Sequence, residues 1–122
     1  MLNISRQIKN ILIAITFLGI VCAQSEVTFD IDGVDDCGFV SVTGTWDGWS
    51  GWGAHTDSGM AASIPAGDHE FVILCVNTDG EWWNDIWGSS TIYNAPIDGS
   101  CWNGNFDYAN YTLNVDGSGN AM

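Results

Sequence analysis

The chain has 122 residues, and its 15 Asp and Glu against two Lys and Arg give a formal net charge of −13 at pH 7. Both cations, Arg6 and Lys9, lie near the start, so no Lys or Arg follows residue 9. Nucleic acids, anionic lipids and phosphorylated ligands are recognised through cations, so the composition argues against all three as partners.

Residues 1–23 are organised like a secretory signal peptide. The basic residues precede the apolar run ILIAITFLGIV (11–21), which is too short to span a bilayer well, and small residues follow it. We expect cleavage after Ala23, with an uncleaved membrane anchor as the alternative. The mature protein is then extracellular or held at the cell surface, with no membrane association once the signal is removed.

The mature chain is expected to form one small domain over residues 24–115, followed by a flexible tail or linker at 116–122. After the signal, short β-type runs alternate with clusters of Gly, Asp, Asn and Ser. The predicted strands are, in chain order, residues 27–32, 39–46, 60–64, 69–76, 90–95 and 111–115. The run 69–76 is apolar on both faces, which predicts a central strand. The pattern is typical of an all-β sandwich of about 6–8 short antiparallel strands.

Seven tryptophans are more than a core of this size can cover. In TGTWDGWSGWG (43–53), Trp46, Trp49 and Trp52 lie three residues apart among glycines that disfavour a helix. The segment predicts a strand that ends in a loop holding aromatic rings near the surface, with Trp46 as a structural ring. Sugars lay C–H groups on aromatic faces, so the composition favours a platform for a neutral polysaccharide.

Three segments resemble, in this order, the starch- and glycogen-binding type of carbohydrate-binding module: VSVTGTWDGW (40–49), IPAGDHEFVI (64–73) and NTDGEWWND (77–85). In that family a strand ends in Gly-x-aromatic-x-x-Trp, then Gly-x-Tyr-x-Tyr-Lys-Phe follows, and a later turn carries a second Trp. The likeness extends over residues 27–115. The sequence resembles still more closely the small β-sandwich modules attached to secreted polysaccharide-degrading enzymes of marine bacteria. The resemblance implies an immunoglobulin-like β-sandwich.

By position, the resemblance implies that Trp49 is the first sugar-stacking ring and Trp82 the second. The residues expected to extend the platform are Trp52, Trp83 and Trp87. The side chains expected to bind sugar hydroxyls are those of Asp47 and Asn84.

The chain departs from the family pattern at positions that bear on the ligand. The lysine of the family's Tyr-Lys-Phe element, which contacts sugar in the glycogen binders, is replaced here by Val72. The tyrosine that precedes this element is replaced by His69. Trp52 and Trp83 are rings without a counterpart in the family. β-Glucans and other algal polysaccharides therefore remain open beside starch and glycogen.

Three cysteines follow the signal, at Cys37, Cys75 and Cys101. Outside the cell, one disulfide and one remaining thiol are expected. Cys75 lies in the apolar run FVILCV (71–76), where a free thiol packs as a small hydrophobe. Cys37 and Cys101 lie in polar, turn-like sequence, so we expect the disulfide to join these two.

The acidic stretch DIDGVDDCG (30–38) allows a calcium interpretation, because carboxylates around a glycine turn are hard oxygen ligands. The candidate ligands are Asp30, Asp32, Asp35 and Asp36. The stretch lacks the spacing of an EF-hand loop and its distal Glu, so we expect no resident cofactor. Asp30 and Asp32 are interpreted instead as the solvated face of the first strand.

Catalysis finds little support in the sequence. The only histidines, His55 and His69, have no metal-ligand or triad partner in recognisable spacing. We therefore expect a monomeric, non-catalytic module that binds a neutral, glucan-like polysaccharide. One alternative is a structural or adhesive surface domain that buries its tryptophans against protein partners. Another is the N-terminal module of a longer glycoside hydrolase.

Overall fold

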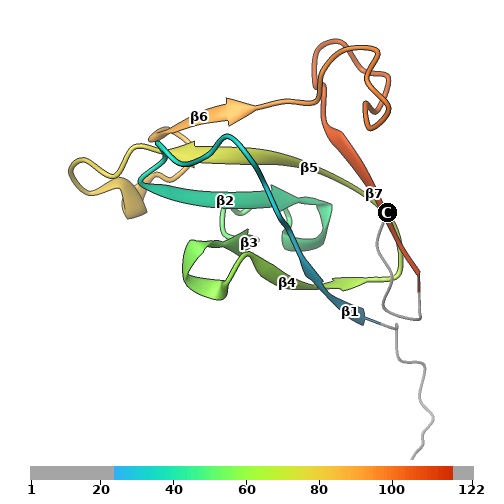
Figure 1. Cartoon of the computed structure of the whole chain (residues 1–122), viewed down its shortest axis with the longest axis horizontal. Coiled ribbons are helices and arrows are strands. Elements are labelled where there is room, and N and C mark those ends of the chain that lie inside the picture. Colours follow the sequence, from blue (N-terminus) through green and yellow to red (C-terminus); the bar gives the residue numbers. More distant parts are fainter. Residues whose placement is uncertain (1–23, 117–122) are drawn as a thin grey trace, which may run out of the picture.

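Within residues 24–116, β-type runs separated by turn-forming residues produce seven antiparallel strands in two sheets, so the prediction of an all-β fold is confirmed for this part of the chain (Figure 1). The computed structural model describes residues 24–116; the expected signal peptide and residues 117–122 lie outside the described residues. The strands are β1 (Gln24–Thr28), β2 (Phe39–Gly44), β3 (Ala54–His55), β4 (Ala61–Pro65), β5 (Gly67–Val76), β6 (Ser90–Tyr93) and β7 (Tyr111–Val115). Three short 3-10 turns are η1 (Thr45–Asp47), η2 (Thr56–Ser58) and η3 (Trp82–Asn84).

Strand β5 is the centre of the larger sheet, as predicted for residues 69–76. β2 pairs along one edge of β5, and the other edge is shared by β7, which pairs with residues 67–71, and β6, which pairs with residues 73–76. β3 extends this sheet beyond β2, whereas β1 and β4 form a separate two-stranded sheet. The chain between β6 and β7 leaves the sheet and projects at the top of Figure 1. Its neck is closed by the Ala95 N–H, which donates to the Ala109 carbonyl at 2.7 Å.

The first strand lies earlier in the chain than predicted. β1 ends at Thr28, and Asp30 and Asp32 are exposed in the loop that follows. The interpretation of these two carboxylates as a strand face is therefore wrong. Strand β3 was not predicted, because two residues, Ala54 and His55, are too short a run to show a period.

The two faces of the larger sheet are covered in different ways. Alternate residues of β5 point to opposite faces. The face that bears Phe71 and Ile73 packs against residues of β1 and β4. The face that bears Val72 and Leu74 is covered, within residues 24–116, by loops rather than by a second sheet. The loop side chains that pack there are the half-buried rings of Trp49, Trp82 and Trp87.

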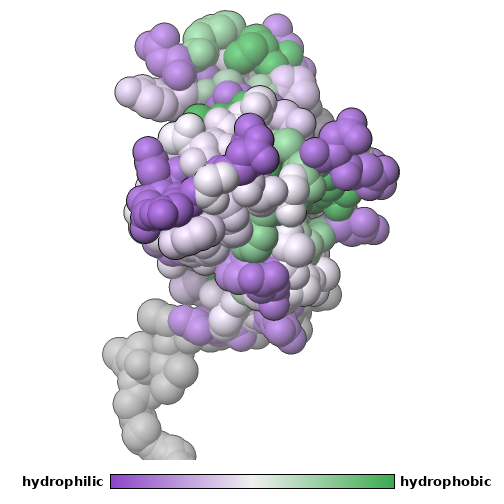
Figure 2. Space-filling model, turned by 90° about the vertical axis from the view of Figure 1, so that its left-hand side faces the viewer, coloured by the Kyte–Doolittle hydropathy of each residue, from purple (hydrophilic) through white to green (hydrophobic). Residues whose placement is uncertain are grey.

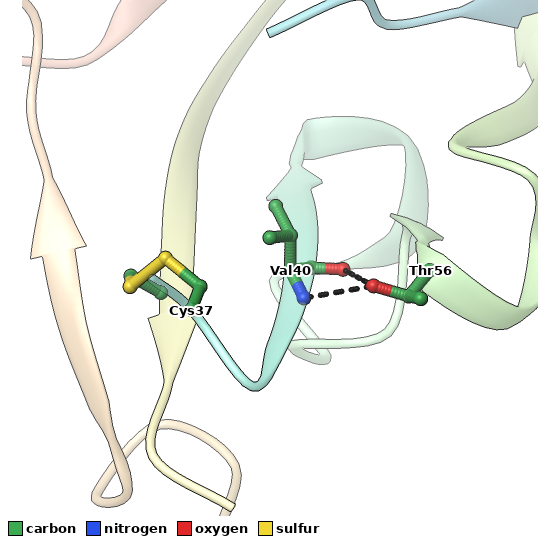
Figure 3. Close-up of a disulfide and its surroundings, with 4 residues drawn as sticks. Cys37, Val40 and Thr56 are labelled. Carbon is green, nitrogen blue, oxygen red and sulfur yellow. Dashed lines mark hydrogen bonds between the residues drawn. A yellow bond between two sulfur atoms is a disulfide. The ribbon is translucent and has the colours of Figure 1, made fainter. Parts of the chain in front are cut away.

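The disulfide joins Cys37 to Cys75, so the predicted bond between Cys37 and Cys101 is wrong (Figure 3). β2 pairs with β5 in a register that places Phe39 opposite Val76. The chain just before β2 therefore lies beside the end of β5. The two Cα atoms of the disulfide are 5.2 Å apart, which is an ordinary separation for this bond.

Cys101 lies towards the other end of β5, and its thiol is free and exposed. Its carbonyl accepts the N–H of Thr112 at 2.8 Å, and Thr112 pairs with Glu70. Glu70 and Cys75 are separated along β5 by roughly 16 Å at the usual rise of a strand. The sheet register thus keeps Cys101 away from both disulfide cysteines, and the prediction of a free, buried Cys75 is also wrong.

The surface carries charge of one sign. No Lys or Arg balances the carboxylates of residues 24–116. Figure 2 shows the end of the molecule where the loop between β5 and β6 lies, with hydrophilic side chains scattered between small hydrophobic patches. No helix within the described range is long and apolar enough to cross a membrane.

Candidate functional site

The tryptophan loop (residues 45–53) is built around one carboxylate. Asp47 accepts three hydrogen bonds, each 2.8 Å long. The donors are the Thr43 hydroxyl, the Gly44 N–H and the Ser50 hydroxyl. Both carboxylate oxygens of Asp47 are therefore engaged in holding the turn that leads out of β2.

Two buried hydroxyls of β2 anchor the other side of the tryptophan loop. The Ser41 hydroxyl donates to the Gly51 carbonyl at 2.7 Å, and the Gly51 N–H donates to the Thr43 hydroxyl at 2.9 Å. Gly51 has a φ of +89°, and a Cβ on it would collide with Ile86. A glycine is thus required where the tryptophan loop meets the loop at 77–89.

Trp49 has a left-handed backbone conformation, with a φ of 59°. This conformation costs a residue with a side chain about 1–2 kcal/mol, so the surroundings must hold it. The Trp49 N–H donates to the Gly44 carbonyl at 3.0 Å, and the indole N–H of Trp87 donates to the Trp49 carbonyl at 2.9 Å. Trp49 and Trp87, which come from separate loops, are therefore fixed relative to each other. Strained residues held in this way are concentrated at binding sites.

A groove of about 450 Å³ opens where β6 ends and β7 begins, and we call it the junction groove. Val72 and Ile92 contribute strand side chains to it, and two indoles and a phenol add flat apolar faces. The amides of two asparagines supply neutral donors and acceptors. Apolar walls with a few placed polar groups are typical of ligand sites. The residues that line the groove are Trp49, Val72, Trp87, Ile92, Asn94, Tyr108 and Asn110.

Tyr108 is presented by a loop whose shape depends on asparagine side chains. The Asn105 side-chain oxygen accepts the N–H groups of Asp107 and Tyr108, both at 2.9 Å. The Asn103 amide donates to the Tyr108 carbonyl at 2.8 Å and to Glu70 at 2.9 Å. The backbone of Tyr108 is thereby tied to the sheet, while its side chain is 72% exposed.

A second aromatic group shares no residue with the junction groove. The ring centroid of Trp82 is 4.7 Å from that of Phe39 and 5.7 Å from that of Trp52. Trp83 meets Trp82 edge-on at 6.1 Å, and His55 stacks on Phe39 at 5.4 Å. Trp82 packs against the core, whereas Trp52 and Trp83 are 38% and 55% exposed.

The predicted platform is therefore divided in two. Trp49 and Trp87 lie in the junction groove, whereas Trp52, Trp82 and Trp83 belong to the second aromatic group. The two rings that the resemblance pairs, Trp49 and Trp82, both pack on the same core cluster but do not line the same groove.

The two side chains predicted to bind hydroxyls lie outside the junction groove. The Asp47 carboxylate is occupied within its own loop. Asn84 is exposed, and its amide donates to Glu81 at 2.8 Å. Trp46 stacks on Phe29, with 5.8 Å between the ring centroids, and lies against the core on the opposite face of the sheet.

Sequence reasoning missed five of the seven residues that line the junction groove: the strand residues Val72 and Ile92, and three residues outside the strands. Tyr108 and Asn110 precede β7, and Asn94 follows β6. The segment DYANYT (107–112) does carry an aromatic ring and an asparagine just before a predicted strand. No local pattern shows that it meets Asn94, because the two segments are brought together by the shared edge of β5 and by the Ala95–Ala109 hydrogen bond.

The candidate calcium ligands do not form a metal site. Within residues 24–116, no three His, Cys, Asp or Glu side chains come together in a way that could hold a metal ion. The four side chains in question are exposed in the loop before β2: Asp30, Asp32, Asp35 and Asp36.

Comparison with known proteins finds no matching family model, no similar curated protein and no similar solved structure. The function is therefore inferred from the residues and the geometry of this site.

Proposed function

We propose that the protein binds a neutral polysaccharide through the junction groove. The observation that carries this proposal is the meeting of two indoles and a phenol with two amide side chains between β6 and β7. Pyranose rings expose C–H patches that pack on aromatic faces, and their hydroxyls pair with neutral amides. Because the Trp87 side chain holds the Trp49 backbone in place, binding requires little further ordering.

The charge of the protein supports a neutral ligand. None of the residues that line the junction groove is charged, and no Lys or Arg follows residue 9. A sulfated or uronic polysaccharide would find no cation in the groove and would approach a protein surface of the same, negative charge, which disfavours binding. Glucans such as starch, glycogen, laminarin and mixed-linkage glucan fit this requirement.

Replacing Tyr108 by Ala is expected to weaken binding about tenfold, which corresponds to about 1.4 kcal/mol. The variant removes one aromatic face of the junction groove, and the exposed phenol contributes little to the core. Affinity electrophoresis measures the effect, in gels cast with each of the four glucans. Trp49→Ala is expected to abolish the retardation that the wild type shows in one of these gels.

Trp83→Ala is the matched control, because it removes an exposed ring of the second aromatic group. It should migrate like the wild type in every gel. Loss of retardation in Trp83→Ala with full retardation in Tyr108→Ala would contradict the assignment of the site to the junction groove.

A second candidate function is an extracellular structural or adhesive domain that assembles with protein partners. The observation that favours it is the exposure of Trp52, Trp83 and Phe106, at 38%, 55% and 73%. Exposed apolar side chains also mark protein interfaces. This candidate predicts association that increases with concentration in sedimentation velocity, and tryptophans shielded from quenchers without any sugar. A monomer with sugar-sensitive tryptophan fluorescence would contradict it.

We propose that the protein acts outside the cell as a non-catalytic module. The Cys37–Cys75 disulfide supports this location, since such bonds persist in oxidising compartments. A two-stranded sheet packed on a five-stranded sheet supports, at this coarse level, the immunoglobulin-like arrangement that the resemblance implies.

A further inference from the structure

A second groove, of about 550 Å³, lies along the first half of β5, and we call it the polar groove. None of the described residues that line it is Trp, Tyr or Phe. Its lining contains hydroxyl, carboxylate and amide side chains, which suit a hydroxylated ligand held by hydrogen bonds rather than by stacking. The polar side chains in question are those of Thr45, Asp68, Glu70, Ser100, Thr112 and Asn114.

The polar groove and the junction groove are neighbours on one strand. Asp68, Glu70 and Val72 are alternate residues of β5 and therefore share a face. The first two line the polar groove, and Val72 lines the junction groove. The distance from Asp68 to Val72 along the strand is roughly 13 Å.

The boundary between the two grooves is itself polar. Asn110, which lines the junction groove, donates its amide to Glu70 of the polar groove at 3.0 Å. The Asn103 amide donates to the same carboxylate oxygen at 2.9 Å. Farther along the polar groove, the Asn114 amide donates to Asp68 at 2.7 Å. The carboxylates are thus oriented by amides, and the polar side chains continue from one groove into the next.

We propose that the two grooves form one cleft that holds an internal segment of a neutral polysaccharide. Some sugar units stack in the junction groove, and the following units bind through their hydroxyls in the polar groove. This inference rests on the proposed function and names the form of its ligand, a chain long enough to occupy both grooves. The second contact is intramolecular once the first has formed, so affinity rises with the length of the chain.

Cys101 provides a built-in reporter for the polar groove. It lines this groove, and it is the free cysteine of the described residues, with an exposed thiol. A chain that reaches into the polar groove shields the thiol from an alkylating reagent. A short ligand confined to the junction groove does not.

The experiment measures two quantities over series of malto- and laminari-oligosaccharides from disaccharide to heptasaccharide. The first is the dissociation constant, by calorimetry. The second is the rate at which iodoacetamide alkylates Cys101, read by mass spectrometry of the peptide that carries it. We expect the longest chains of one series to bind about tenfold more tightly than its disaccharide. We expect them also to slow alkylation, while saturating disaccharide leaves the rate unchanged.

Two variants separate this inference from the proposed function. Asp68→Ala is expected to lower the affinity for long chains and to leave that for short chains unchanged, whereas Asp57→Ala, which removes one exposed carboxylate in η2, changes neither. Equal affinity for short and long chains, with Cys101 alkylated at the same rate in both, would overturn the continuous cleft while leaving the junction groove as the site. Absence of binding at every length, with the polysaccharide gels also negative, would overturn the proposed function itself.

Discussion

Replacing both Cys37 and Cys75 by Ser is expected to lower the free energy of unfolding by about 4 kcal/mol. The disulfide joins residues 38 positions apart. On the chain-entropy model, a cross-link that closes a loop of this length raises the free energy of the unfolded state by about 4 kcal/mol, because it restricts the unfolded chain. The bond ties the segment before β2 to the end of β5, so its removal also frees the entry into the central sheet. For a domain of this size, the melting temperature is expected to fall by about 20 °C. Thermal and urea denaturation, followed by tryptophan fluorescence, measure both quantities.

Cys101→Ser is the control for this prediction. Its thiol is exposed and lies outside the disulfide, so the variant should unfold like the wild type. A large loss of stability in Cys101→Ser, with little in the double variant, would show that the disulfide assignment is wrong. Peptide mapping without reduction identifies the linked pair directly.

Asp47→Ala is expected to destabilise the protein by about 3 kcal/mol, because three hydrogen bonds to a carboxylate disappear together. The Thr43 hydroxyl and the Gly44 N–H also lose a partner where the tryptophan loop leaves β2. Since Trp49 holds its backbone conformation through the same turn, we expect the variant to lose polysaccharide binding as well. Urea unfolding and affinity electrophoresis test the two effects separately.

Asp47→Asn and Asp57→Ala are the matched controls. The asparagine keeps an oxygen that can accept the Gly44 N–H, so it should retain more stability than the alanine. Asp57→Ala removes the same charge at an exposed position of η2 and should behave like the wild type. Normal stability with abolished binding in Asp47→Ala would instead assign to this carboxylate the direct sugar contact that the sequence predicts.

Most of the strands could be predicted because their signal is local, whereas the two-residue β3 and the bounds of β1 could not. The final strand, 111–115, matches β7, and the apolar run around Leu74 is central because both of its faces are buried. The disulfide could not be predicted in this way. Which cysteine faces Cys37 depends on the register of β2 against β5, and the choice among three cysteines follows from a pairing that no local pattern encodes.

The candidate site was predictable only in part, for the same physical reason. The glycine-rich spacing around Trp49 correctly indicates a loop that carries aromatic rings. The same spacing does not show that the Trp52 ring packs against Phe39, nor that the Trp49 carbonyl accepts the indole N–H of Trp87. The spacing also does not show that the Asp47 carboxylate accepts three hydrogen bonds within its own loop. A carboxylate beside a tryptophan is equally compatible with a sugar contact and with a turn.

The closed neck between β6 and β7 encloses an excursion of the chain that contributes to both grooves, with Tyr108 in the junction groove and Ser100 and Cys101 in the polar groove. Each of the two strands bonds to its own half of β5, and the Ala95–Ala109 hydrogen bond joins the ends of the excursion between them. Residues 96–108 are also tied to the sheet at two points: the Cys101 carbonyl accepts the Thr112 N–H, and the Asn103 amide donates to Glu70. Changes of sequence or length in this segment that keep these two contacts are therefore expected to leave the register of β6 and β7 unchanged. The neck thus makes this segment a graft point: under the proposed function, a library of sequences inserted here with those two contacts kept is expected to alter ligand preference while the strands stay in place.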